Sequence, residues 1–490
     1  MQVKDLFEYE DEIFIDRRID REKRLLPVFR TSDIREDSIL IYPKRLGTRE
    51  YRIPALSKAP YAIIAGEDVI EGSTDVPLIK VPDPRRCAAF TFSKEYGIDY
   101  NKLSVIGITG TNGKTTTAEI LFYLLRAAGY NVGYIGTGEI RINENIISDK
   151  SYSMTTPDPD DLYKVLSDMQ RQGCDYAVME VSSHSLSLSK VTPIKFKRAI
   201  FTNLTEEHMD FHTDLEDYYH TKLSLFRQAE SGIFNLDDPY SKRALGEAGM
   251  KGESIGIIDT SADACITAYT SKGLDGSAFF YKEKNIIFKI KLALGGAYNV
   301  YNSMLAIKCA ISLGVNPCTI RRAIPTLKSV RGRLNVIKSD VTVVIDYAHT
   351  SAALKEVLFF LKSTLSPGQS LTTVFGCGGE RDKSKRAEMG KIAESFSDIV
   401  VVTEDNSRGE NFDLIVKMIL SGMTKNKHIV IESRSDAIRT AILSANKDDI
   451  VAVIGKGHEK YIIDSSGKHD FDEEKIIMSA LEERKLQNEN

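Results

Sequence analysis

The most specific chemical signal is a glycine-rich segment, residues 107–116, which reads G-I-T-G-T-N-G-K-T-T. It follows a short apolar run and precedes a helix-like stretch, an arrangement typical of a phosphate-binding loop. Glycines let backbone N–H groups turn onto phosphate oxygens, and the helix N-terminus adds the positive end of its dipole. We expect Lys114 to reach the β- and γ-phosphates of a nucleotide, and Thr115 to offer its hydroxyl to Mg²⁺. Five residues separate the outer glycines where the usual pattern has four, so a glycine-rich turn without a ligand is the alternative.

Two further polar side chains follow predicted strands. Glu180 ends an apolar run, on the side where ligands bind in doubly wound sheets, and a carboxylate there can hold Mg²⁺ beside Thr115. His208 lies in the segment 202–212, T-N-L-T-E-E-H-M-D-F-H, and is a candidate metal ligand or proton carrier. A surface or satisfied core histidine is the alternative. Lys222, judged from its helical surroundings alone, is expected to be a solvated helix lysine.

Alternating apolar runs and helix-like stretches predict an α/β protein built from mostly parallel, doubly wound sheets. We expect a small α/β unit at 1–102, a central ATP-binding unit with a P-loop-type sheet at 103–334, and a Rossmann-like sheet at 335–490. The predicted strands are 38–42, 61–65, 105–109, 176–181, 199–202, 232–235, 342–345, 371–375, 399–402, 428–431 and 450–454. The predicted helices include 114–128, 352–362 and 385–395.

Length and composition support this organisation. At ~150 residues per domain, 490 residues correspond to roughly three domains. A net charge of −4 provides no global basic field, so we predict no nucleic-acid partner. The six cysteines lack CxxC spacing and read as reduced thiols. The N-terminus lacks the apolar core of a signal peptide, and no apolar run reaches ~18 residues, so we expect a cytoplasmic protein without a membrane span. We also expect a monomer.

The loop at 107–116 resembles the variant found in the Mur ligases, ATP-dependent amide-forming enzymes of cell-wall synthesis. Segments 180–184, 202–212, 155–160 and 219–226 resemble further motifs of that family. The family lysine corresponding to Lys222 is carbamylated and, with the histidine corresponding to His208, holds a second Mg²⁺. Carbamylation turns a cation into a carboxylate-like oxygen ligand, which suits this hard metal ion. The resemblance thus implies ATP, two Mg²⁺ ions and the metal-binding residues Thr115, Glu180, His208 and carbamylated Lys222.

The resemblance extends the nucleotide site into later segments. Residues 296–302, G-A-Y-N-V-Y-N, are similar to the family segment that contacts adenine, and its two asparagines share one helix face. An R-G-R segment at 331–333 and a D-Y-A-H-T segment at 346–350 resemble motifs near the phosphates and ribose. The nucleotide-binding residues expected in this way are Gly110, Thr111, Asn112, Gly113, Lys114, Thr115, Thr116, Asn299, Asn302, Arg333, Asp346 and His349.

Three more segments point to the branch of the family that adds a diamino acid. They are 376–386 (G-C-G-G-E-R-D-K-S-K-R), 405–408 (D-N-S-R) and 455–459 (G-K-G-H-E). In that branch the residues matching Arg381 and Arg408 hold carboxylates, with Arg408 on the distal one, because a guanidinium matches a carboxylate bidentately. Asp405, Asn406 and Glu459 are expected to hold the distal ammonium group. The substrate-binding residues implied by the resemblance are Thr155, Thr156, Ser182, Lys190, Arg381, Asp405, Asn406, Arg408, Gly455 and Glu459.

The resemblance covers residues 103–475 and implies addition of meso-diaminopimelate to UDP-N-acetylmuramoyl-L-alanyl-D-glutamate through an acyl phosphate. Lys114, Lys222, His208 and Glu180 are the implied catalytic residues. The sequence departs from the family at residues 29–33, F-R-T-S-D in place of a uridine-contacting motif, at Lys190 in place of arginine, and at Ser407 in place of proline. Two alternatives stay open: a ligase that adds L-lysine or another diamino acid or uses another precursor, and a P-loop NTPase with a switch or binding role.

Overall fold

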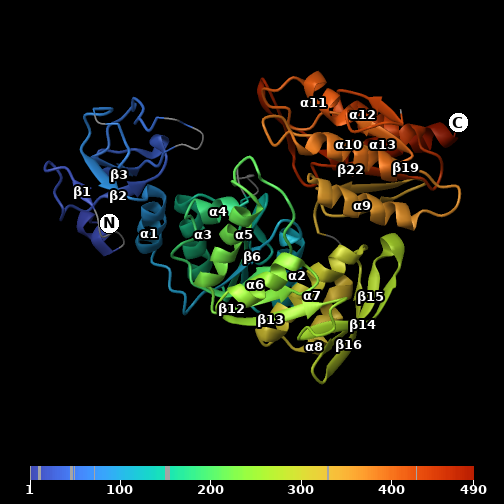
Figure 1. Cartoon of the computed structure of the whole chain (residues 1–490), viewed down its shortest axis with the longest axis horizontal. Coiled ribbons are helices and arrows are strands. Elements are labelled where there is room, and N and C mark those ends of the chain that lie inside the picture. The colour runs from blue at the N-terminus through green and yellow to red at the C-terminus, as the bar shows by residue number, and fades with distance from the viewer. Residues whose placement is uncertain are drawn as a thin grey trace.

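The computed structural model describes residues 2–8, 13–44, 48, 50–70, 72–148, 155–327, 330–425 and 427–489. The described residues form a five-stranded sheet, an eleven-stranded sheet, a six-stranded sheet and a small two-stranded hairpin. The predicted α/β class is confirmed. Figure 1 shows the sheets as three successive masses along the chain, with the eleven-stranded sheet in the middle. None of the helices formed by these residues combines the length and the apolar character needed to cross a membrane.

The first sheet has the order β1-β5-β4-β3-β2, and only its edge strand β1 is antiparallel among the described residues. Its strands are β1 (Phe14–Ile15), β2 (Leu26–Val28), β3 (Ser38–Ile41), β4 (Ala62–Gly66) and β5 (Leu78–Val81), accompanied by 3₁₀ turns at Val3–Glu8 and Thr31–Asp33. Helix α1 (Pro84–Tyr96) follows; Asp83 caps its N-terminus and Gly97 ends it in the left-handed conformation. Helix α1 leads directly to the central sheet.

The central sheet has the order β16-β15-β14-β13-β12-β11-β6-β10-β7-β8-β9. Its strands are β6 (Ser104–Thr109), β7 (Val132–Gly136), β8 (Glu139–Ile142), β9 (Asn145–Ser148), β10 (Tyr176–Glu180), β11 (Phe196–Phe201), β12 (Ser231–Asn235), β13 (Lys251–Gly256), β14 (Ala264–Ser271), β15 (Ser277–Glu283) and β16 (Ile286–Leu292). The strands from β7 to β14 in this order run parallel, whereas β8, β9, β15 and β16 are antiparallel edges. The prediction of a mostly parallel sheet is confirmed, and the antiparallel edges were not predicted.

Helices connect and cover these central strands. They are α2 (Lys114–Ala127), α3 (Pro159–Arg171), α4 (Ser183–Ser187), α5 (Leu215–Leu223), α6 (Pro239–Glu247), α7 (Ala297–Ser312) and α8 (Pro317–Ala323), with 3₁₀ turns at Ser224–Gln228, Gly273–Asp275 and Ile324–Thr326. Alternate side chains of β6 pack on opposite faces of the sheet. Val105 belongs to the hydrophobic core that contains α3, and Ile106 and Ile108 belong to the core that contains α2 and α7. A strand buried on both faces reads as a continuous apolar run, which is why β6 was predictable.

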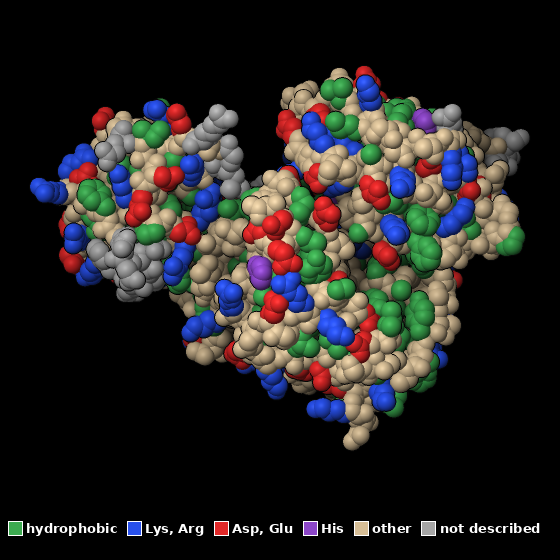
Figure 2. Space-filling model, in the orientation of Figure 1, with side chains coloured by type: hydrophobic (Ala, Val, Ile, Leu, Met, Phe, Trp, Pro, Cys, Tyr) green, Lys and Arg blue, Asp and Glu red, His purple; other side chains and the backbone are tan. Residues whose placement is uncertain are grey.

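The C-terminal sheet has the order β17-β18-β22-β19-β20-β21, with β17 antiparallel and the others parallel. Its strands are β17 (Asn335–Lys338), β18 (Thr342–Asp346), β19 (Leu371–Phe375), β20 (Ile399–Val402), β21 (His428–Val430) and β22 (Ile450–Ile454), and β23 (Tyr461–Asp464) and β24 (Gly467–Asp470) form the hairpin. The helices are α9 (Ser351–Thr364), α10 (Lys385–Phe396), α11 (Phe412–Leu420), α12 (Arg434–Ser444) and α13 (Glu473–Glu489). Figure 2 shows a notch between the C-terminal part and the N-terminal part, with the central part at its base.

The predicted strands and helices agree with the structure to within about two residues, with one exception. Strand β11 begins at Phe196, three residues before the predicted start at 199. Lys197 and Arg198 are only partly buried, and their charges interrupt the apolar run from which the strand was predicted. The loops that follow β6, β10, β11, β18, β19, β20 and β22 carry the motifs of the sequence, so the carboxyl edges of the two larger sheets hold the candidate site.

Candidate functional site

The glycine-rich loop leaves the end of β6 and enters α2 at Lys114. Gly110 has φ +143° and Gly113 has φ +84°, values that favour glycine. A Cβ on Gly110 would lie 1.9 Å from Oγ1 of Thr202, and a Cβ on Gly113 would lie 2.3 Å from Oδ1 of Asn302. The loop therefore packs so closely against the end of β11 and against α7 that neither glycine can be replaced without moving a neighbour.

Lys114 folds back over this loop. Its Nζ donates to the carbonyl oxygens of Gly110 at 3.0 Å and Thr111 at 2.9 Å. Burial lowers the pKa of Lys114, and the nearby carboxylates of Glu180 and Glu207 oppose that shift. The ammonium group is thus held beside the loop whose N–H groups would face phosphate.

Glu180 lies at the end of β10 and is almost fully buried. It accepts hydrogen bonds from the Thr115 hydroxyl at 3.0 Å, the Thr137 backbone N–H at 2.9 Å and the Tyr134 hydroxyl at 3.3 Å. The sequence predicted that Thr115 and Glu180 meet, and the structure brings them together. Thr137 was missed, because it lies in the turn between β7 and β8 and belongs to no motif.

The threonine pair at 155–156 joins the same cluster. The Thr137 hydroxyl donates to Oγ1 of Thr155 at 3.3 Å, and the Thr156 hydroxyl donates to the Glu180 carbonyl at 3.1 Å. Ser182 follows: its N–H donates to Oγ1 of Thr156 at 3.3 Å, and its hydroxyl caps α4. These predicted substrate-binding residues therefore surround the carboxyl end of β10.

Lys222 is fully buried, so the expectation of a solvated helix lysine is wrong. Helix α5 directs it inward, where Nζ donates to the Gly110 carbonyl at 2.9 Å, the same oxygen that accepts from Lys114. The ring of Tyr218 lies 4.4 Å from this nitrogen. Burial, reinforced by the nearby charge of Lys114, holds the pKa of Lys222 well below its ordinary value. Helical periodicity from one sequence does not reveal which face of α5 is covered.

His208 adopts a left-handed backbone conformation with φ +61°. Its ring contacts that of His184, with 4.8 Å between the centroids. Burial, together with the neighbouring His184, Lys222 and Lys114, lowers the pKa of His208 to about 3 against the opposing charge of Glu207. The imidazole is therefore neutral at pH 7 and has a lone pair for a metal ion. Within the described ranges, no three His, Cys, Asp or Glu side chains converge as a metal cluster, so the predicted set depends on Thr115 and a modified Lys222.

Three residues predicted to bind the nucleotide, which follow β16 in the chain, lie near the loop at 107–116. Asn299 and Asn302 share a buried face of α7: Nδ2 of Asn302 donates to Oδ1 of Asn299 at 3.4 Å, and Nδ2 of Asn299 donates to the Gly295 carbonyl at 2.8 Å. Nη2 of Arg333 donates to the Thr115 hydroxyl at 3.2 Å. The segment that connects the two larger sheets thus touches the candidate phosphate loop.

Asp346 and His349 follow β18 and have different surroundings. The Asp346 carboxylate accepts from the N–H groups of Leu334 at 2.7 Å and Ala348 at 2.8 Å, so it fixes the turns that surround it. Nε2 of His349 lies 3.5 Å from Oε1 of Glu207, which follows β11 of the central sheet. This contact joins the carboxyl edges of the two sheets, and Glu207 was not predicted as a site residue.

The residues predicted to bind the added amino acid lie together at the carboxyl edge of the C-terminal sheet. Nδ2 of Asn406 donates to Oε2 of Glu459 at 2.9 Å. Nη1 of Arg408 donates to the carbonyls of Gly379 at 2.8 Å and Asn406 at 3.1 Å, and Arg408 itself has φ +55°. Burial, together with the neighbouring positive charge of Arg381, lowers the pKa of Arg408. Arg381 lies exposed in the loop after β19.

Two side chains of this edge were missed. Lys456 is fully buried between Asp405, Asn406 and Glu459. The signal that could have identified it is its position between two glycines inside the G-K-G-H-E segment. Arg434, at the start of α12, is also fully buried. No motif marks it, and a buried arginine cannot be recognised from a single sequence.

Arg434 supports both loops of this edge. Its Nε donates to Glu473 at 2.6 Å, Nη1 donates to the Glu404 carbonyl at 3.1 Å and Nη2 donates to the Ile454 carbonyl at 2.9 Å. Glu404 and Ile454 immediately precede Asp405 and Gly455, so one guanidinium connects the ends of β20 and β22. The Glu473 carboxylate is its buried counter-ion.

We predict that Arg434→Ala lowers the free energy of unfolding by about 3–5 kcal/mol, because it leaves the Glu473 carboxylate buried without its partner. Urea denaturation at pH 7 measures this change. Arg439→Ala, which removes a half-exposed arginine from an ion pair with Glu483, is the matched control and should leave the free energy of unfolding almost unchanged, because exposed ion pairs contribute little. Equal losses in the two variants would contradict the supporting role of Arg434.

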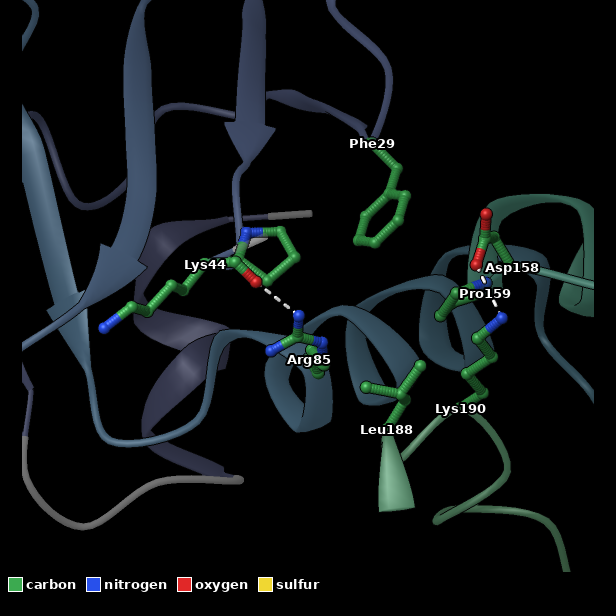
Figure 3. Close-up of a pocket in the computed structure, with 8 residues that line it drawn as sticks. Phe29, Lys44, Arg85, Asp158, Pro159, Leu188 and Lys190 are labelled. Atoms are coloured by element: carbon green, nitrogen blue, oxygen red, sulfur yellow. Dashed lines mark hydrogen bonds and ion pairs between the residues drawn. The ribbon is translucent and has the colours of Figure 1, made fainter. Parts of the chain in front are cut away.

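A cavity of about 170 Å³ lies between the N-terminal and central parts (Figure 3). Lys190 is nearly fully buried here, and its Nζ lies 2.7 Å from Asp158. Arg30, in the stretch that replaces the uridine-contacting motif, pairs with Asp161 and lies 3.2 Å from Asp160 at the start of α3. The lining residues are Phe29, Pro43, Lys44, Arg85, Asp158, Pro159, Leu188 and Lys190. The divergent stretch thus faces the predicted substrate residues across the interface.

Comparisons with known proteins agree with this geometry. Residues 108–310 match the Mur ligase middle domain, and residues 332–457 match the Mur ligase glutamate ligase domain. The UDP-N-acetylmuramoyl-L-alanyl-D-glutamate–2,6-diaminopimelate ligase of Clostridium botulinum is 38% identical over 444 residues, 89% of this chain and 90% of the relative. The ligase of the same name from Chlorobaculum tepidum is 37% identical over 449 residues, 88% of this chain and 87% of the relative.

Solved structures share the fold of the whole chain or of its larger part. A structure of a UDP-N-acetylmuramoyl-L-alanyl-D-glutamate–2,6-diaminopimelate ligase superposes with a TM-score of 0.66 and 26% identity, and covers 99% of both chains. The E. coli FolC structure in complex with DHPP and ADP, at 19% identity and a TM-score of 0.61 over 76% of this chain and 90% of that chain, shares the fold. From its domains, its relatives and its architecture, the chain belongs to the Mur ligase family.

Proposed function

We propose that this protein is an ATP-dependent amide ligase of the MurE type, which adds meso-diaminopimelate to UDP-N-acetylmuramoyl-L-alanyl-D-glutamate in peptidoglycan precursor synthesis. The observation that carries the proposal is the placement of Arg408 on the same loop as Asp405, whose neighbour Asn406 bonds Glu459, in a chain whose relatives are named for 2,6-diaminopimelate. A guanidinium suits the distal carboxylate of this amino acid, and the carboxylates suit its distal ammonium group.

The residues of the central edge fit ATP and Mg²⁺. The loop at 107–116 offers N–H groups and Lys114 to the phosphates, and Asn299, Asn302, Arg333, Asp346 and His349 are the further nucleotide-binding candidates. The Thr115 hydroxyl and the Glu180 carboxylate, 3.0 Å apart, are oxygen donors of the kind that Mg²⁺ prefers. When bound, ATP supplies the phosphoryl group and the metal ions neutralise charge on its phosphates.

The reaction requires an activated carboxyl group. Transfer of the γ-phosphoryl group to the glutamate side-chain carboxylate gives an acyl phosphate, which the amine of the diamino acid attacks, and phosphate leaves from the tetrahedral intermediate. Lys114 stabilises the charge that develops during phosphoryl transfer. The neutral imidazole of His208 and the buried amine of Lys222, as its carbamate, are the proposed ligands of a second Mg²⁺.

We assign the substrates to three domains. The central domain, 103–334, would bind ATP, and the C-terminal domain, 335–490, would bind the amino acid. The N-terminal domain, 1–102, would hold the UDP moiety, and this assignment is supported by the cavity at its border with the central domain. The Arg85 guanidinium brings positive charge to the lining of that cavity, which suits a diphosphate, while Lys190 is paired there with Asp158. We further propose that the enzyme acts as a monomer in the cytoplasm.

Arg408→Ala tests which amino acid is added. We expect the variant to lose about 2–3 kcal/mol of transition-state binding for meso-diaminopimelate, roughly 30- to 150-fold in kcat/KM, and far less for L-lysine. This is the lower end for a charged hydrogen bond, because the Arg408 guanidinium also binds the carbonyls of Gly379 and Asn406. The measurement is coupled ADP release with both amino acids and the UDP-muramoyl dipeptide.

Arg171→Ala, at a largely exposed arginine of α3, is the matched control and should leave both rates unchanged. If wild type prefers L-lysine, or if Arg408→Ala leaves the preference unchanged, the diaminopimelate assignment is wrong and the ligase assignment survives. If ADP is released without dipeptide and without amino acid, the protein is an NTPase and the ligase assignment itself fails.

A further inference from the structure

The amino-acid edge contains an ammonium group of its own. Nζ of Lys456 is 3.1 Å from Oδ1 of Asn406, 3.2 Å from Oε2 of Glu459 and 3.5 Å from Oδ1 of Asp405. These are the side chains that the sequence assigned to the distal ammonium group of the added amino acid. The chain therefore brings a resident cation to a place where a substrate cation was expected.

Two glycines hold Lys456 in this position. Gly455 has φ +120° and Gly457 has φ +55°. A Cβ on Gly457 would lie 2.7 Å from Cβ of Tyr347 and 2.8 Å from the Gly332 carbonyl oxygen, so the loop packs tightly against the connection between the two larger sheets. The Gly455 N–H also donates to the Asp346 carbonyl at 2.9 Å. Because the backbone is fixed on both sides, Lys456 stays directed into the cluster.

Lys456 also fixes the chemistry that Asn406 offers. The Asn406 side-chain oxygen accepts from Nζ of Lys456 at 3.1 Å and from the Ile463 N–H at 3.0 Å. Its Nδ2 donates to Glu459 at 2.9 Å, and an amide nitrogen has one more hydrogen to donate. In this arrangement Asn406 is a donor, which suits a substrate carboxylate better than a substrate ammonium group.

The resident cation changes the charge of the subsite. Asp405 and Glu459 contribute two negative charges, and Lys456 cancels one of them. Burial alone would raise the pKa of Asp405, but the Lys456 ammonium and the Arg434 guanidinium hold that pKa below its ordinary value. Arg408 lies on the same loop as Asp405 and contributes the balancing positive charge. A distal end with both an ammonium and a carboxylate adds no net charge here, whereas a lone distal ammonium adds one.

We propose that Lys456 is a specificity-determining residue of the amino-acid subsite, whose resident ammonium disfavours amino acids with a lone distal cation and favours those that also carry a distal carboxylate. This inference rests on the proposed ligase function. It adds a repulsive element to the attraction of Arg408 for the distal carboxylate.

The test is Lys456→Met, which keeps the length of the side chain and removes its charge. We expect the ratio of kcat/KM for meso-diaminopimelate to that for L-lysine to fall about 10- to 100-fold, because a charge a few ångströms from the distal amine is lost in a partly buried site. The KM for ATP should stay within about twofold of wild type. Lys460→Met, at a mostly exposed lysine four residues away, should leave the ratio unchanged.

Glu459→Gln provides a test that does not depend on how well Lys456→Met folds. It removes one negative charge from the same cluster, so the ratio should move in the opposite direction, further against L-lysine. An unchanged ratio in both variants, with both amino acids losing activity equally, would overturn the proposal and leave Lys456 a structural residue. A wild-type enzyme that ligates neither amino acid would instead refute the proposed function.

Discussion

Lys114→Ala should lower the kcat of ligation by at least about 10³-fold, because it would remove the cation that we propose meets the charge developing on the transferred phosphoryl group. In the structure the Lys114 ammonium rests on the carbonyls of Gly110 and Thr111, within the loop that would hold the phosphates. Moving from these carbonyls to a phosphate requires only rotations of a flexible side chain. Coupled ADP release at saturating substrates measures the effect.

Lys102→Ala, at a mostly exposed lysine just before β6, should retain wild-type kcat and serves as the matched control. The melting temperature of Lys114→Ala should stay near that of wild type, since the side chain is only partly buried and packs against a loop. Activity within about tenfold of wild type in a folded Lys114→Ala enzyme would refute the phosphate-binding role of this lysine.

The parts of the fold that were predicted from the sequence have strong local signals. Strands β6 and β22 are buried on both faces and therefore appear as continuous apolar runs. The loop at 107–116 combines glycines, a lysine and threonines in an arrangement typical of a phosphate-binding loop, and it lies between β6 and α2 as predicted. Each of these features is fixed by residues adjacent in the chain.

The edges of the central sheet were not predicted, because their signal is weaker. In β16 (Ile286–Leu292) apolar and lysine residues alternate, and only part of its side chains are buried. Such a strand depends on its antiparallel pairing with β15, which lies next to it in the chain but carries no motif. Half-buried edge strands of this kind can be told from loops only when their partners are known.

The candidate site was predicted as a set of residue types, and the structure adds burial and partners. The burial of Lys222 and of Lys456 depends on segments far away in the sequence: the Gly110 carbonyl for the first, and Asp405 and Asn406 for the second. A lysine reads as solvated unless its surroundings are known, because lysine is rarely buried without a partner. The sequence therefore predicted which of these residues lie near one another, but not which of them are buried.

Lys222 has the surroundings that favour carbamylation. Two ammonium groups, those of Lys114 and Lys222, share the Gly110 carbonyl, and burial holds the pKa of Lys222 well below its ordinary value. A neutral amine attacks CO₂ to give a carbamate and a proton, R–NH₂ + CO₂ → R–NH–COO⁻ + H⁺. The product would carry a negative charge beside the Lys114 ammonium, an attraction that the neutral amine lacks. The carbamate oxygens are also ligands of the kind that Mg²⁺ prefers.

Lys222→Ala should therefore lower kcat by at least about 10³-fold, since it would remove the proposed carbamate ligand, and a metal ion contributes several kcal/mol of charge stabilisation; short carboxylates such as acetate should partly restore activity. Wild type in ¹³C-bicarbonate should give a carbamate NMR signal that the variant lacks. Lys164→Ala, at an exposed lysine of α3, should keep both the signal and the activity. A fully active Lys222→Ala enzyme would rule out a catalytic carbamate. Loss of activity without the NMR signal in wild type, and without rescue by acetate, would leave Lys222 the simpler role of holding the Gly110 carbonyl and the phosphate loop in place.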